Sequence, residues 1–190
     1  MRARLAAALG AIPAILAACA TIAPGPAASP HLALANPGFE QAPFSESCAR
    51  GWNCSMHADP NSFRFFLDAS QPASGLRSLC IEPVKHEPWG EATQAIVDPA
   101  LAGKRLRFSV AVRTEGVATG RGAGPIIVAH GGTGQVLAVR ERLVKGSRGW
   151  ERLAVELDVP PSGVHDVEVG VMLDGTGRAC LDDAVLEAIR

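Results

Sequence analysis

Residues 86–91, His-Glu-Pro-Trp-Gly-Glu, hold the densest run of chemically active side chains in the sequence. A histidine followed by a glutamate opens the zinc-protease motif H-E-x-x-H, which needs a second histidine one helical turn later. That second histidine is missing, and Pro88 would break the helix that has to carry both ligands. The run therefore excludes this zinc chemistry and predicts a loop that leads into a strand over residues 92–97.

The same loop carries the best candidates for ligand binding. Trp89 combines an apolar ring with a polar N–H, which suits stacking on a sugar ring if the side chain is exposed. His86 and Glu87 lie beside it in the sequence and would supply hydrogen bonds. The alternative is that Trp89 packs on a sheet edge. With three Trp, six Phe and no Tyr in the chain, any aromatic platform for a sugar is small.

Hydrolytic chemistry finds little support in the residue pattern. A glycosidase needs two carboxyl groups that flank one cleft, and Asp68, Glu87 and Glu91, with His57 as a further titratable group, show no spacing that singles out a pair. The stretch His130-Gly-Gly is similar to an oxyanion-hole motif, but no G-x-S-x-G nucleophile elbow or phosphate-binding loop accompanies it. The sequence predicts a protein that is not an enzyme.

The first 19 residues read as an export signal. Arg2 and Arg4 precede an uncharged apolar run of about 14 residues, too short to span a bilayer. Leu-Ala-Ala-Cys19 ends the run and resembles a bacterial lipobox, in which the cysteine is acylated. This predicts an outer-membrane lipoprotein held by lipid at Cys19; the alternative is ordinary secretion with cleavage after Ala20. Residues 20–35, rich in Ala and Pro, read as a tether.

The four other cysteines predict two disulfides, as expected for an exported chain. Cys48 and Cys54 enclose five residues and look like a local staple, which leaves Cys80 to pair with Cys180. Strand alternation argues against the second pair, because it places the two cysteines on different faces of their strands unless a bulge intervenes. With no C-x-x-C pair in the chain, metal binding by these cysteines is the weaker alternative.

The elements that must position these residues read as β-strands. Apolar side chains alternate with polar ones over residues 105–113, 153–159 and 167–173, which is typical of half-buried antiparallel strands. Further strands are expected over 76–83, 92–97, 125–130, 136–144 and 179–189, with Gly- and Pro-rich turns between them. We therefore expect an all-β, two-sheet antiparallel sandwich over residues 36–190, with Trp52 and Trp150 in its core and Phe63, Phe65 and Phe66 divided between core and edge.

An ordered series of short motifs supports this architecture. In chain order the motifs are Asn36-Pro-Gly-Phe-Glu40, Gly51-Trp52, Gly75-Leu-Arg-Ser-Leu79, Leu101-Ala-Gly-Lys104, Ser109-Val-Ala-Val-Arg-Thr-Glu115, Trp150, Gly175-Thr-Gly177 and Leu181-Asp-Asp-Ala-Val-Leu186. The series resembles the carbohydrate-binding-module jelly rolls with galactose-binding-like topology, and it covers nearly the whole mature chain.

The resemblance also implies a structural calcium ion between the first and last strands, with Glu40 and Asp182 as side-chain ligands. The alternative is that Asp182 and Asp183 hydrogen-bond neighbouring backbone. Two residues depart from the family pattern, since Cys180 stands where tryptophan is usual and Ala184 where valine is usual. No other cofactor is expected.

Charge and family together define two hypotheses for function. With 18 basic and 19 acidic residues and a net charge of −1, the chain has no electrostatic footprint for nucleic acid. The first hypothesis is a non-catalytic, envelope-tethered module that binds a glycan or polysaccharide. The second is a structural or protein-interaction adaptor with an envelope protein as partner and no sugar ligand.

Overall fold

The computed structural model describes residues 31–41 and 48–189. The predicted signal peptide, Cys19 and residues 20–30 of the predicted tether lie outside these ranges. Eleven strands and one short 3-10 helix make up the described part. They are β1 (His31–Leu32), β2 (Asn53–Met56), β3 (Phe63–Asp68), β4 (Ser78–Pro83), β5 (Trp89–Ile96), η1 (Pro99–Leu101), β6 (Arg105–Val117), β7 (Gly122–Gly131), β8 (Val136–Glu141), β9 (Gly146–Asp158), β10 (Val164–Asp174) and β11 (Arg178–Ile189).

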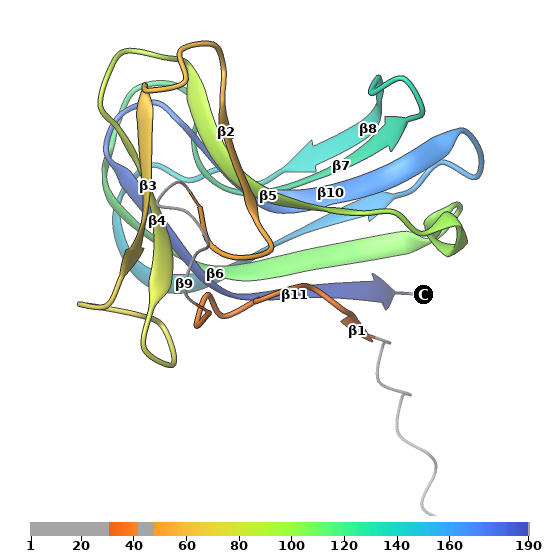
Figure 1. Cartoon of the computed structure of the whole chain (residues 1–190), viewed down its shortest axis with the longest axis horizontal. Coiled ribbons are helices and arrows are strands. Elements are labelled where there is room, and N and C mark those ends of the chain that lie inside the picture. The colour runs from red at the N-terminus through yellow and green to blue at the C-terminus, as the bar shows by residue number, and fades with distance from the viewer. Residues whose placement is uncertain (1–30, 42–47, 190) are drawn as a thin grey trace, which may run out of the picture.

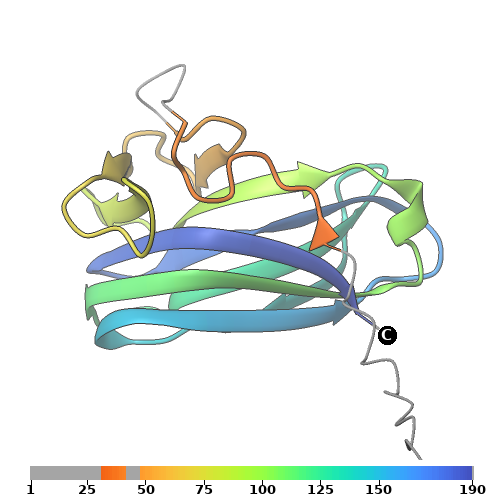
Figure 2. The same cartoon turned by 90° about the horizontal axis from the view of Figure 1, so that it is seen from below.

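The strands form two antiparallel sheets packed face to face, which confirms the all-β sandwich (Figure 1). We name them sheet A, with strand order β3-β4-β11-β6-β9, and sheet B, with strand order β2-β5-β10-β7-β8. The short strand β1 joins sheet A by pairing with the end of β11, so it lies close to the C-terminus of the sandwich (Figure 2).

Alternation of side chains builds the core between the sheets. The apolar residues of β6, β9 and β10 that the sequence placed on one face are buried. Each such side chain contributes roughly 1.5–3 kcal/mol when it is fully buried. Among the buried residues of these strands are Leu106, Phe108, Val110, Val112, Leu153, Leu157, Val167, Val169, Val171 and Leu173.

The start of the domain differs from the sequence prediction. His31 and Leu32 pair with Glu187 and Leu186 of β11, and the backbone of Ala35 is held by the side chain of Gln94 at 2.8 Å. Residues 31–35 were assigned to the tether because they carry no charge and no clear alternation. They belong to the sandwich, because β1 completes the edge of β11 beyond the point where β4 ends.

Besides β1, two strands escaped the sequence analysis. Strands β2 and β3 are the edge strands of their sheets, and neither follows a long apolar alternation. Phe63 and Phe65 point into the core and Phe66 onto the opposite face, which agrees with the expected division of these rings. Trp52 is buried against Phe39, with ring centroids 5.0 Å apart. Trp150 is not in the core, since it lies half-buried on the outer face of sheet A.

Both predicted disulfides are present, Cys48–Cys54 and Cys80–Cys180. Cys80 and Cys180 face each other directly across β4 and β11 on the outer side of sheet A. A bulge lies between Asp182 and Val185 in β11, where Asp183 takes a positive φ of 50°. The bulge reverses the alternation, so Leu181 and Leu186 both reach the core although their numbers differ in parity. This resolves the objection to the second pairing.

Candidate functional site

A groove of about 210 Å³ lies on the outer face of sheet B, away from the sandwich core. In Figure 1 the edge strands β2 and β8 lie above β5 and β10. Strand alternation selects the lining, because residues next to core positions on β5, β7 and β10 must point outward. The lining residues are Trp89, Glu91, Ile126, Val128, His130, Val136, Val139, Glu141, Glu168 and Met172.

Most of the groove surface is apolar. Ile126 is buried in its floor, and Val136 and Val139 of β8 are exposed on one side. Trp89 is half-buried and meets the ring of His57 edge-on, with centroids 6.0 Å apart. The sequence analysis selected Trp89 because an exposed ring can stack on a sugar, and the structure places it in a groove where a ligand can reach it.

The polar groups of the groove are mainly carboxylates. Burial raises the pKa of Glu91, the Ser55 hydroxyl opposes this by donating a hydrogen bond at 3.1 Å, and the charge of Glu168 adds to the rise. His130 Nδ1 lies 3.0 Å from Asp166 Oδ1 and 3.8 Å from Glu168 Oε2. The groove therefore combines a desolvated acid, a second acid and a histidine whose orientation Asp166 sets.

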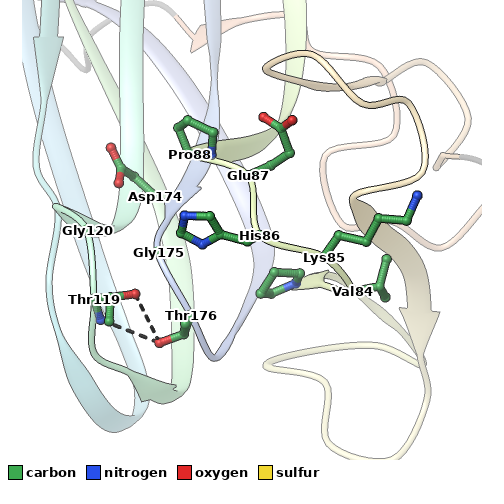
Figure 3. A pocket seen from close by; sticks show the side chains of 11 residues that line it. Val84, Lys85, His86, Glu87, Pro88, Thr119, Gly120, Asp174, Gly175 and Thr176 are labelled. Atoms are coloured by element: carbon green, nitrogen blue, oxygen red, sulfur yellow. Dashed lines mark hydrogen bonds between the residues drawn. The ribbon is translucent and has the colours of Figure 1, made fainter.

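The remaining sequence candidates for ligand binding lie at another cavity, shown in Figure 3. This end pocket, of about 470 Å³, lies between the 83–88 loop and the turns at 119–120 and 174–176. The ring of His86 lies between the two sides of the pocket, whereas the carboxylate of Glu87 points away from it. Glu87 is instead 3.0 Å from His57 Nδ1. The structure thus separates His86 from Trp89, although they are close in sequence, whereas Glu87 contacts His57, the ring that Trp89 meets edge-on.

The proposed calcium ligands are close in space but serve another purpose. Asp182 is fully buried, and its Oδ2 accepts hydrogen bonds from the amides of Ala73 and Ser74 at 3.0 and 3.1 Å. Its Oδ1 accepts one from Asp183 N at 2.8 Å. Glu40 Oε1 accepts from the amide of Leu76 at 2.8 Å and from the next amide at 3.3 Å. Both carboxylates therefore fasten the 73–77 loop by binding N–H groups.

These hydrogen bonds do not fit a calcium cage. Calcium takes six to eight oxygen ligands, whereas amide donors already occupy three of the four carboxylate oxygens of Glu40 and Asp182. Burial raises the pKa of Asp182, and the amide bonds from Ser74 and Asp183 oppose that rise. The arrangement matches the alternative in which the acidic side chains bind backbone, here at a bulge of the central strand β11. We derive no function through a bound metal, and calcium stays a prediction.

Other groups that could have formed a reactive centre lie apart or are already bonded. Asp68 is on the outer face of sheet A, opposite the face that holds Glu91. Within residues 31–41 and 48–189, Asp68, Cys80 and Cys180 are the one group of three potential metal ligands that lie within 4.8 Å of one another. The two cysteines are joined as a disulfide and supply no thiolate to a metal.

The groove also contains residues that the sequence analysis did not select. Glu168 belongs to the predicted strand over residues 167–173, Asp166 immediately precedes it, and His130 ends the predicted strand over residues 125–130. Their alternation with buried valines indicated that they point outward. What it did not indicate is that β5 lies beside β10, with Glu91 opposite Met172 and Ala95 opposite Glu168, so that both acids line one groove.

Comparisons with known proteins place the fold. No protein-family model matches the chain, and a search of curated proteins finds no matching sequence. The CBM22-1 xylan-binding domain of Xyn10C from Paenibacillus barcinonensis is similar, with a TM-score of 0.55 and 14% identity over 80% of this chain and 92% of that one. The Stig cyclase Fisc from Fischerella sp. TAU gives 0.61 and 13% over 85% and 98%.

A third similar structure is the enzymatically active domain of tailspike protein 4 of bacteriophage CBA120. Its TM-score is 0.56 and its identity 15%, over 74% of this chain and 20% of that chain, so this protein spans about a fifth of its length. The fold is therefore the jelly roll of carbohydrate-binding modules, as the motif series implied. Binding modules and enzymes share it, so the fold by itself does not assign a function.

The described residues contain no helix that is long and apolar enough to cross a membrane.

Proposed function

We propose that this protein is a non-catalytic glycan-binding module, tethered to the cell envelope, that binds its ligand in the groove of sheet B. The observation that carries the proposal is the position of Trp89. Its ring lies beside apolar side chains of β7 and β8, and the carboxylates of Glu91 and Glu168 can accept hydrogen bonds from sugar hydroxyls. Similarity to a xylan-binding domain of low sequence identity supports the fold on which this groove is built.

The groove lacks hydroxyl, thiol and amine nucleophiles. Its ten lining residues include no serine, threonine, cysteine or lysine that could attack a substrate, and its carboxylates are the remaining groups that could act on a glycan. His130 is close to two carboxylates and has no hydroxyl or thiol beside it in that lining. A groove of this kind can hold the apolar face of a sugar and its hydroxyls.

The place where the described chain begins is compatible with a tether. Strand β1 pairs with the last residues of β11, whereas the end pocket lies next to the first residues of that strand. Strand β11 has twelve residues in extended conformation, so its two ends lie about 40 Å apart. An anchor on the N-terminal side would hold the 83–88 loop away from the membrane. Replacing Cys19 with serine should then move the protein from the membrane fraction to the soluble fraction.

The test of glycan binding compares two tryptophans. Affinity electrophoresis of the purified full chain in gels that contain soluble xylan or other polysaccharides should retard the wild-type protein. Trp89→Ala should weaken binding by about tenfold or more, since full burial of a large apolar side chain is worth roughly 1.5–3 kcal/mol. Trp150→Ala on the outer face of sheet A is the matched control and should bind as wild type. Retardation that Trp89→Ala leaves unchanged would remove the groove as the site.

One observation favours the adaptor hypothesis as a second candidate. Strand β8 is an edge of sheet B, and its Val136 and Val139 are 59% and 45% exposed. An exposed strand edge with apolar side chains can pair with a strand of another protein. If no polysaccharide retards the protein and an envelope protein co-purifies in stoichiometric amount, the adaptor replaces the glycan-binding module.

A further inference from the structure

The groove of sheet B carries negative charge that the protein does not neutralise. Among its ionisable lining residues, Glu141 is compensated because Arg121 Nη1 lies 2.6 Å from Glu141 Oε1 and 2.8 Å from Oε2. Glu91 and Glu168 have no such partner. Within the ion pairs of the described residues, neither contacts a lysine or arginine, and the basic group paired with Glu168 is the imidazole of His130 at 3.8 Å.

His130 does not balance these two acids. Its Nδ1 is closer to Asp166, at 3.0 Å, than to Glu168. Two carboxylates, Asp166 and Glu168, therefore share one imidazole, and Glu91 lies further along the groove. Glu91 has the Ser55 hydroxyl as its hydrogen-bond donor, and a hydroxyl carries no charge. An ionised carboxylate in an apolar site is costly unless it is paired, so the groove favours a ligand that brings a positive charge.

A second, independent observation comes from Thr93. It lies two residues after Glu91 on β5, and strand alternation puts both side chains on the groove side of sheet B. Thr93 is 1% exposed and its hydroxyl is among the buried polar atoms that have no hydrogen-bond partner within the described chain. Gly170 opposite it on β10 provides no side chain that could supply one. Thr93 is not among the residues that line the groove, so its hydroxyl is an unsatisfied polar group beneath the groove surface, next to Glu91 on the same face of β5.

The rest of the lining limits what that positive charge can belong to. Trp89, Val136 and Val139 offer a ring and two aliphatic groups, which suit the C–H faces of a pyranose rather than a bare metal ion. Metal ions of the calcium or zinc kind need several close oxygen or nitrogen ligands, and Glu91, Glu168 and His130 do not form such a close group. A sugar that carries an ammonium group satisfies both parts of the groove.

Building on the proposed glycan binding, we infer that the groove selects glycans with free, protonated amino groups, that is hexosamine units, over neutral and acidic glycans. The ammonium pairs with Glu91, two residues from Trp89 on β5, and the pyranose ring lies against Trp89. Glu168, opposite Ala95 in the register of β5 and β10, adds negative charge further along the same groove. A neutral sugar puts a hydroxyl in the same place and leaves both carboxylates without a counter-charge. An acidic glycan is repelled by them. Because the net charge of the whole chain is only −1, a general attraction for polycations is weak and the preference comes from the groove.

The experiment uses three matched ligands. Oligomers of β-1,4-linked glucosamine, N-acetylglucosamine and glucose of equal length differ only in the group on C2, so they isolate the charge. Isothermal titration calorimetry of the purified full chain, at a pH where the amine is protonated, should give an affinity about tenfold or more higher for the glucosamine oligomer. Added salt should reduce this preference, since charge pairing is screened.

Two variants locate the effect. In Glu91→Gln/Glu168→Gln the shape is kept and both charges are removed, so the three ligands should bind with nearly equal affinity. Glu156→Gln is the control. It removes the same charge from the outer face of sheet A, where Glu156 pairs with Arg105 at 2.9 Å, and it should keep the preference. Circular dichroism and thermal unfolding check that each variant is folded.

The outcomes separate this inference from the proposed function. If the glucose oligomer binds as tightly as the glucosamine oligomer, and Trp89→Ala abolishes both, the glycan-binding module stands and the amine preference is wrong. If none of these oligomers and no polysaccharide binds, the proposed function fails as well. A preference that survives in the double variant, or that Glu156→Gln weakens equally, reflects general charge attraction and also overturns the inference. Release of shorter oligomers during the titration would contradict the non-catalytic role.

Discussion

The outer faces of the two sheets use similar residue types in opposite ways. On sheet A, arginines lie over the aromatic rings, with Arg64 4.6 Å from the centre of Phe66 and Arg113 5.6 Å from the centre of Trp150. The same arginines are neutralised, because Arg64 pairs with Glu82 at 3.0 Å and Arg113 with Asp68 at 3.2 Å. Sheet A therefore satisfies its aromatic rings and its charges within the chain.

Sheet B leaves the corresponding groups without partners from the chain. Trp89 meets only the edge of the His57 ring among the ring contacts of the described residues, and Glu91 and Glu168 lack an arginine or lysine. The comparison teaches that an aromatic residue and a carboxylate on a sheet surface do not by themselves mark a binding site. What distinguishes the groove is that no arginine or lysine of the described residues pairs with its carboxylates Glu91 and Glu168 or lies over the ring of Trp89.

The disulfide on the outer face of sheet A also stabilises the fold. Cys80–Cys180 closes a loop of 100 residues, which contributes on the order of 4–5 kcal/mol in the chain-entropy model. Arg113 lies over it, with Nη2 3.6 Å from Cys180 Sγ. The disulfide, Arg113 and Asp68 together form one buried cluster. This cluster explains how the face tolerates Cys180 at a position where the family resemblance leads us to expect tryptophan.

The largest effect is expected from breaking this cluster. Arg113→Met removes the partner of Asp68, whose carboxylate is only 14% exposed, and should lower the free energy of unfolding by about 3 kcal/mol. Chemical denaturation measures this. Arg105→Met, which breaks the exposed pair with Glu156 on the same face, should cost less than about 1 kcal/mol. Glycan binding should survive both substitutions; loss of binding in Arg113→Met with an intact fold would move the site to sheet A.

A smaller effect, of opposite sign on the two faces, is expected from removing one glutamate charge. Burial raises the pKa of Glu91. Burial alone would also raise that of Glu82, but hydrogen bonds and charge from Arg64 and Arg178 lower it. Because the pKa of Glu91 is raised in the folded protein, this group contributes stability below its ordinary pKa of 4.5. That contribution is lost as the pH rises through the pKa of the folded state. Because the pKa of Glu82 is lowered in the folded protein, this group contributes stability above pH 4.5, and the contribution is lost on acidification.

Glu91→Gln should therefore unfold at a higher temperature than wild type at pH 7, by about 2–4 °C, and the difference should vanish as pH falls below 4.5. Glu82→Gln should unfold at a lower temperature at pH 7, and its deficit should shrink on acidification. Thermal unfolding of both variants between pH 3.5 and pH 8 measures the two signs. If both variants shift the unfolding temperature at pH 7 in the same direction, the two faces do not differ as described.

The smallest effect is expected from removal of calcium. Because amide donors occupy the oxygens of Asp182 and Glu40, a calcium chelator should leave the unfolding temperature unchanged. Asp182→Asn is the comparison: it takes acceptor capacity from the buried amides of Ala73 and Ser74 and should cost about 1–3 kcal/mol with or without calcium. A lower unfolding temperature in chelator, restored by added calcium, would reinstate the metal that the family resemblance implied.

Strand identity was predictable where burial is one-sided. Leu106, Phe108, Val110 and Val112 are buried as their alternation predicts, because a strand between core and solvent must expose every second residue. Strands β2 and β3 were not predicted, since they lie at sheet edges and are short. The disulfide partners were predicted from cysteine number and spacing, whereas their common face was not, because it depends on the bulge at Asp183.

The sequence by itself determined that this chain forms a β-sandwich with two cross-links, because side-chain alternation and cysteine count act locally or by simple pairing. It also singled out Trp89. Only the tertiary structure decided what surrounds that ring. The pairing of β5 with β10 places Glu91 and Glu168 along the same groove. The chain before β5 carries His86 to the end pocket, and the carboxylate of Glu87 turns to His57. Contacts between strands that are distant in sequence depend on the order of strands in each sheet. The alternation of side chains along one strand does not predict which strands will lie beside it.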